Sequence, residues 1–114
     1  MVVERGLISK IALKHNWSIS DAKRKLMGTA TEYTKRYIKE VTGKSYEELP
    51  KGKRLVLWIT ALGIMLPAFW EATREKDDIP TYEEVRKKID ELVKARKTLA
   101  ERLETLKKAV TLVV

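Results

Sequence analysis

A seam of apolar residues spaced alternately three and four positions apart is the strongest constraint on how this chain can fold. The seam consists of Tyr82, Val85, Ile89, Leu92, Leu99, Leu103, Leu106, Val110 and Val113. Arg96 alone interrupts it. This spacing places the residues on one side of an α-helix, as in coiled coils and left-handed bundles. It predicts one helix over 81–112, about 50 Å long.

Three further helices are predicted upstream, because no segment shows the alternating pattern of a strand. They are expected over 3–15, from Ser18 or Ser20 to Thr42, and over 54–76 with a kink between Gly63 and Pro67. Gly43 fits the left-handed position after a helix end. The apolar stripe of the second helix is Ile19, Ala22, Leu26, Ala30, Tyr33, Tyr37 and Val41. Trp17 is expected to pack between the first two helices.

The third helix is only about 30 Å long, so a hairpin cannot cover the whole seam of the fourth. The sequence therefore predicts that another subunit packs on the far end of the seam, where the apolar tail 110–114 also lies. The fold class predicted is all-α, in one domain over 1–114. Residues 1–50 form a basic helical arm, and 51–114 form an apolar helical hairpin or bundle.

The hinge between these parts is predicted at 43–53. Ser45 and Glu48 have the spacing of a capping box, and Pro50 and Gly52 end any helix that starts there. Thr81 and Glu84 form a second capping box at the start of the last helix. The chain thus marks its own helix boundaries with local signals.

Positive charge is concentrated in the N-terminal half. Residues 1–54 hold 13 Lys/Arg against 6 Asp/Glu, whereas 55–114 hold 11 against 10, within a total of +8. On the second helix Arg24, Gly28, Thr31, Lys35 and Lys39 form one stripe, where small residues let a phosphate backbone approach. The predicted nucleic-acid contacts are Lys10, Lys14, Lys23, Arg24, Lys25, Lys35, Arg36, Lys39, Lys44, Lys51, Lys53 and Arg54.

Binding without sequence specificity is expected, because Gln is absent and Asn16 is the only asparagine. Contacts to phosphate position a protein on a duplex but carry no sequence information. The alternative interpretation is a solvated helix face in a lysine-rich protein. The excess of positive charge in the N-terminal half favours nucleic-acid binding, since solvated helix faces usually carry charges of both signs.

Nothing in the sequence indicates catalysis, so no enzyme, cofactor or metal is predicted. The chain has no Cys and a single histidine, His15. Residues 42–45 resemble the end of a phosphate-binding loop, but the glycine that the motif needs is replaced by Ile38.

The run from Leu55 to Trp70 carries no charge over 16 residues. It is shorter than the roughly 20 residues that span a bilayer and is interpreted as a buried helix, with lipid contact as the alternative. The lack of Cys and Gln and the 35% of charged residues are typical of a hyperthermophile.

A basic helical arm over 1–50 followed by an apolar bundle resembles the major capsid proteins of rod-shaped and filamentous viruses of hyperthermophilic archaea. The resemblance implies a virion protein, present in the host cytoplasm before assembly. It implies a homodimer or heterodimer that wraps double-stranded DNA, held in the A form, within a helical filament. The family's phosphate contacts correspond to Lys10, Lys14, Lys23, Arg24, Lys25, Lys35, Arg36 and Lys39.

Three alternatives remain open at this point. The first is a small helical subunit of an archaeal ribonucleoprotein, such as a CRISPR effector complex, which would prefer RNA or single strands. The second is a coiled-coil interaction module, which would dimerise tightly without binding nucleic acid. The third is an envelope-associated virion protein that uses 55–70 to contact lipid.

Overall fold

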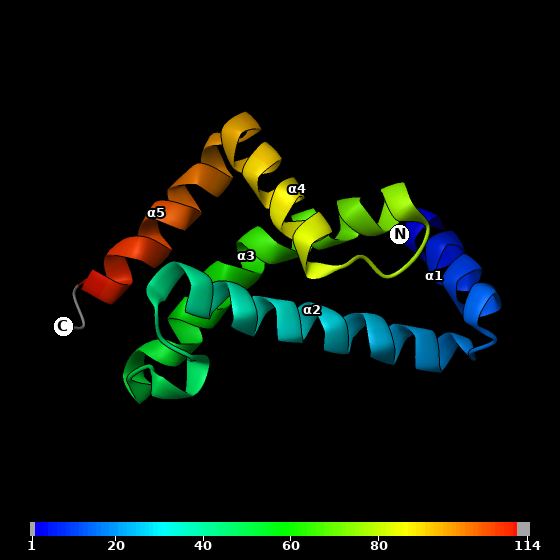
Figure 1. The fold of residues 1–114 in the computed structure, drawn as a ribbon, viewed down its shortest axis with the longest axis horizontal. Helices are drawn as coiled ribbons and strands as arrows, with labels where there is room; N and C mark the ends of the chain where they lie inside the picture. The colour runs from blue at the N-terminus through cyan, green and yellow to red at the C-terminus, as the bar shows by residue number, and fades with distance from the viewer. Residues whose placement is uncertain (1, 112–114) are drawn as a thin grey trace.

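The structure, a computed structural model, describes the backbone of residues 2–111 and the side chains of 6–108. Within that part of the chain every regular element is helical, which confirms the predicted all-α class. Figure 1 shows the helices crossing one another around α3. The elements are α1 (Val2–His15), α2 (Ile19–Thr42), the 3-10 helix η1 (Tyr46–Glu48), α3 (Lys51–Lys76), α4 (Tyr82–Ala95) and α5 (Lys97–Thr111).

The helix ends lie where local chemistry predicts them. The Asp21 N–H donates to Ser18 Oγ at 3.0 Å, which caps α2, and Gly43 ends that helix with φ 77°. The capping box of Thr81 and Glu84 is present at the start of α4. The third predicted helix is longer than expected, because α3 begins at Lys51 directly after Pro50.

The single long helix predicted over 81–112 is wrong, because the chain breaks at Arg96. This residue is extended, with φ −125° and ψ 114°, and separates α4 from α5. The two helices diverge from that point, as Figure 1 shows near the apex of the molecule. The heptad pattern continues on both sides of Arg96, so both helices keep an apolar face and α3 packs against each of them.

The far half of the seam is therefore covered within one chain. Leu99 and Leu106 are buried and Leu103 is half-buried in the common core. The reason given for a partner subunit, that no other helix of the chain reaches this part of the seam, does not hold for Leu99 and Leu106, because α5 packs on α3. The partner itself stays a prediction. Val110, Val113 and the tail 110–114 lie outside the described side chains.

Pro67 provides one attachment point for α5. Proline has no N–H, so the carbonyl of Gly63, four residues earlier, loses its helical donor. Arg102 of α5 supplies a donor instead, with Nη1 2.9 Å from Gly63 O. Glycine at position 63 lets Arg102 approach this carbonyl closely, because a Cβ at Gly63 would lie only 3.2 Å from Arg102 Cδ. The helix continues through Pro67, and its free carbonyl anchors another helix.

Residues of the predicted arm belong to the same core as the bundle. Leu26, Tyr37 and Ile38 of α2 are buried together with Phe69 of α3 and Ile89 of α4. An arm that stands apart from the bundle is therefore not confirmed. The predicted apolar stripe of α2 is inward-facing except at its start, because Ile19 is exposed.

A polar network also joins α2 to α4. Tyr82 Oη donates to Glu40 Oε1 at 2.8 Å, and Arg86 Nε donates to Glu40 Oε2 at 2.6 Å. The Arg86 guanidinium also lies 5.3 Å from the centre of the Tyr37 ring. Burial raises the pKa of Tyr37 to about 12. Burial and the bond to Glu40 likewise raise the pKa of Tyr82, so both phenols stay protonated.

Candidate nucleic-acid interface

The basic face of α2 is defined by Arg24, Gly28, Thr31, Lys35 and Lys39. All five residues are exposed, and they lie opposite the buried side of the helix, as predicted. In Figure 1 α2 runs lengthwise along one side of the molecule. The basic face is therefore a straight row of cationic and small residues that the rest of the described structure does not cover.

Two acidic residues on the same side of α2 were missed by the sequence reasoning. Asp21 and Glu32 fall within the exposed arc at helical spacing, and Asp21 lies 3.5 Å from Arg24. Their position could have been read from the period of 3.6, which places them beside the cations. The face is thus cationic on balance, with two negative interruptions.

Gly28 lies in the middle of this face with open space around it. A Cβ built there would meet no atom within 4 Å, so packing does not require the glycine. The residue borders a shallow depression lined by Trp17, Lys25, Gly28, Thr29, Glu32, Tyr33 and Ile79. A glycine in an exposed helix interior lowers stability, so its presence is consistent with close approach of a ligand.

We expect Gly28→Ala to raise the free energy of unfolding by about 0.5–1 kcal/mol, because alanine is the better helix former. Urea denaturation followed by circular dichroism measures this difference. Gly28→Leu is expected to be at least as stable as the parent but to bind duplex DNA more weakly, because its side chain projects from the basic face. A loss of stability in Gly28→Ala would contradict the open geometry.

A second group of cations gathers where α2 ends and α3 begins. Lys35 Nζ and Arg54 Cζ lie 5.9 and 5.8 Å from the centre of the Tyr46 ring. Lys35 also lies 3.6 Å from Glu47, one of two acids in this region. The pKa of Glu48 is lowered by hydrogen bonds from Ser45 and by nearby lysines, so this carboxylate stays charged. The cations of this hinge cluster are Lys35, Lys39, Lys44, Lys51, Lys53 and Arg54.

The first turn of α3 adds to the positive potential of the hinge cluster. Pro50 precedes the helix and makes no side-chain cap, and no acidic residue occupies the first turn. The positive end of the helix dipole therefore coincides with Lys51 and Lys53, both exposed. This helix start therefore suits an anion.

Five of the predicted contacts make interactions that hold the fold together. Arg36 lies 4.1 Å from the centre of the Tyr82 ring and 3.7 Å from Glu83. Arg54 Nε donates to Leu49 O at 2.9 Å, which fastens η1 to α3. The five are Lys14, Lys25, Lys35, Arg36 and Arg54, which contact Asp77, Trp17, Tyr46, Tyr82 and Leu49 respectively. Among the others Lys44 is half-buried, whereas Lys10, Lys23, Arg24, Lys39, Lys51 and Lys53 are exposed.

His15 has a structural place at the end of α1. Its Nε2 lies 2.7 Å from Asp78 Oδ1, and its ring stacks on Trp17 at 4.2 Å, which places Trp17 between the first two helices as predicted. Burial alone would raise the pKa of Asp78, but hydrogen bonds from His15 and the Ile79 N–H lower it. Among the described residues no three His, Asp or Glu side chains gather as metal ligands.

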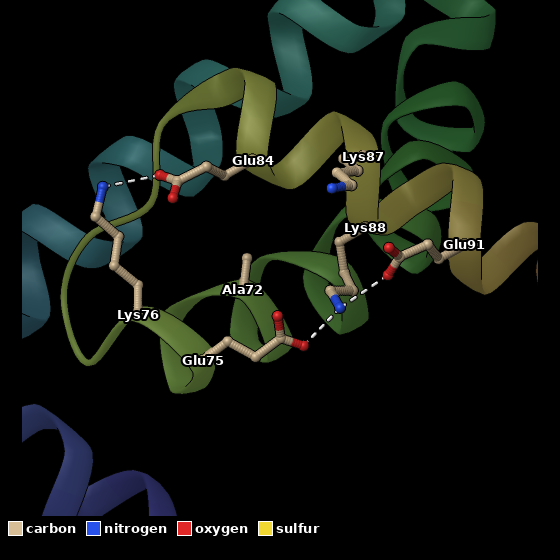
Figure 2. Close-up of a pocket in the computed structure, with 7 residues that line it drawn as sticks. All are labelled: Ala72, Glu75, Lys76, Glu84, Lys87, Lys88 and Glu91. Atoms are coloured by element: carbon tan, nitrogen blue, oxygen red, sulfur yellow. Dashed lines mark hydrogen bonds and ion pairs between the residues drawn. The ribbon is translucent and has the colours of Figure 1, made fainter.

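The groove between α3 and α4 is filled by the protein's own ion pairs. Figure 2 shows Lys76 reaching Glu84, and Lys88 placed between Glu75 and Glu91. Lys76 Nζ lies 2.8 Å from Glu84, and Lys88 Nζ lies 2.9 Å from Glu91. Three lysines and three glutamates line the groove, so it carries no net charge for a ligand to complement. Its effect is to join the two helices.

The ion pair between Lys76 and Glu84 in this groove should make the free energy of unfolding depend on pH. Hydrogen bonds from Lys76 and the Thr81 N–H lower the pKa of Glu84 from 4.5 to about 2, so its ionised form stabilises the fold. That contribution is complete above about pH 4.5 and is lost as the pH falls to about 2. We expect Glu84→Gln to be less stable than the parent at neutral pH, with a difference that vanishes in acid. Denaturant titrations at several pH values test this, and a pH-independent difference would contradict it.

No protein-family model, curated protein or solved structure matches the chain. The function is therefore inferred from the geometry of the residues described above.

Proposed function

We propose that this protein binds double-stranded DNA without sequence specificity and has no catalytic activity of its own. The observation that carries the proposal is the basic face of α2, whose three cations and two small residues are all exposed in one row. Neutralising phosphates with such a row releases condensed counterions, which is the main source of non-specific affinity. The row contains no Asn or Gln, the side chains that pair bidentately with adenine, and its cations can all be used on phosphates.

The dimensions of α2 suit this role. Its 24 residues span about 36 Å, close to one turn of duplex DNA. The hinge cluster lies at the C-terminal end of α2, and Lys23 and Arg24 lie near the other end. A duplex laid along α2 meets cations over the length of the helix, while Gly28 and Thr31 leave room for its backbone.

The finer form of the proposal is a virion subunit that packages DNA in a helical filament, as a homodimer or heterodimer. The supporting observations are the charge asymmetry, the exposed basic face and the resemblance to archaeal viral capsid proteins. Because α1 and α2 pack in the core, each subunit contacts the duplex from one side. Many subunits side by side around the DNA then exclude water from it, without a separate arm.

Fluorescence anisotropy with two duplexes of unrelated sequence and one single-stranded RNA tests the proposal. We expect equal affinity for the duplexes and a linear fall of log K with log salt, with a slope of about −0.9 for each phosphate contacted. Electron microscopy of the protein with long DNA is expected to show filaments of uniform width. A strong preference for RNA would favour the ribonucleoprotein alternative, and no binding near physiological salt would overturn DNA binding.

A further inference from the structure

Three large apolar side chains are exposed together at the start of α3. Leu55, Val56 and Ile59 are 68%, 61% and 59% exposed. Leu55 and Ile59 lie one helical turn apart, and the next residues on that side are Leu62 and Leu66, which are half-buried and 37% exposed. Hydrophobic exposure is therefore greatest at the N-terminal end of the helix. Leu55, Val56 and Ile59 are called the apolar tip below.

The tip belongs to a helix of unusual composition. Among the described residues α3 alone is long and apolar enough to cross a membrane, judged by length and composition. Only 39% of its most apolar window is buried, although α2, α4 and α5 pack against other parts of the helix. Part of this surface is thus free to contact something other than the protein's own helices.

Cations lie beside the tip, and within α3 the acids are distant from it. Lys51 and Lys53 are exposed one turn before it, and α3 carries no acidic residue until Glu71. The positive end of the α3 dipole lies beside the same lysines. An apolar group next to a positive surface is the arrangement by which helices bind the interface of anionic membranes.

We propose that the apolar tip and the two lysines beside it bind the surface of an anionic lipid bilayer. Leu55, Val56 and Ile59 enter the boundary between headgroups and acyl chains, while Lys51 and Lys53 contact lipid phosphates. The helix rests on the surface without crossing it, because α2, α4 and α5 pack against its other side.

A second copy of the chain fits this surface less well than lipid does. Each chain carries a charge of +8, so pairing two tips brings their lysines together with only Glu47 and Glu48 nearby to compensate them. A stable dimer also needs about 800 Å² of surface from each partner, more than three side chains provide. An anionic bilayer compensates the charge and accepts a small apolar group.

Cosedimentation with vesicles tests this inference. The probes are vesicles of phosphatidylcholine alone and of an equimolar mixture with phosphatidylglycerol. We expect binding to the anionic vesicles, weakened about tenfold or more in Leu55→Ser/Ile59→Ser. We expect Lys51→Gln/Lys53→Gln to lose the preference for anionic lipid. The matched control is Leu13→Ser, since Leu13 is 84% exposed on α1, at the opposite end of the molecule from η1 in Figure 1, and its loss should change nothing.

The outcomes separate this inference from the proposed DNA binding. Leu55→Ser/Ile59→Ser should bind duplex DNA like the parent. Arg24→Ala, which changes the basic face outside the hinge cluster, should bind vesicles like the parent. Equal vesicle binding by the parent and the Leu55→Ser/Ile59→Ser variant would overturn the lipid surface. A parent that is dimeric by light scattering, with a monomeric Leu55→Ser/Ile59→Ser variant, would assign the tip to a second copy instead.

Discussion

Leu106→Ala lowers the free energy of unfolding by about 2–5 kcal/mol, because the substitution leaves a cavity in the core. Leu106 of α5 is fully buried within one chain. The unfolding midpoint of the parent should therefore be the same at all protein concentrations. Urea denaturation followed by circular dichroism at several concentrations measures both quantities.

Substitutions at two less buried leucines provide the comparison for this result. Leu103→Ala, at a half-buried position on the same helix, should destabilise less, and Leu13→Ala, at an exposed position, should have almost no effect. A midpoint that rises with concentration would show that a second subunit completes the core around α5. That outcome would support the partner subunit that the sequence predicts for a single long helix over 81–112.

Arg24→Ala/Lys35→Ala/Lys39→Ala weakens binding to duplex DNA by about a hundredfold near 0.1 M salt, since each lost phosphate contact removes one counterion-release contribution. The slope of log K against log salt should become shallower by about 2 to 3. All three side chains are exposed, so the fold should remain intact. Anisotropy titrations over a range of salt concentrations measure the affinity and the slope.

The matched control removes the same charge from another surface. Lys87→Ala/Lys94→Ala/Lys97→Ala changes three exposed lysines of α4 and α5, away from the basic face. We expect its salt slope to stay close to that of the parent. Equal losses in the two triple variants would show that total charge, rather than the basic face of α2, determines binding.

Helix ends were predictable because their causes are local. Ser18 caps α2 through a hydrogen bond to a residue three positions away, and Gly43 ends it with a positive φ. The break at Arg96 was not predicted, because the apolar spacing continues in phase on both sides of it. The charged residue within the seam was the one available signal for the break.

The candidate interface was predictable to a similar degree. The period of 3.6 residues places Arg24, Lys35 and Lys39 on one side of α2, and the structure leaves them exposed. The same period also places Glu32 among them. The sequence could not show that Arg36 packs on Tyr82, because that contact joins residues far apart in the chain.

By itself, the sequence determined the helical class, most helix boundaries and the row of cations on α2. These features depend on periodicity and on hydrogen bonds between near neighbours, which any window of the chain contains. Only the tertiary structure decided that α5 folds back onto α3, that the carbonyl freed by Pro67 is bound by Arg102, and that the apolar tip stays uncovered. These features depend on which surfaces meet, and packing between distant segments selects one arrangement among several that the same local pattern allows.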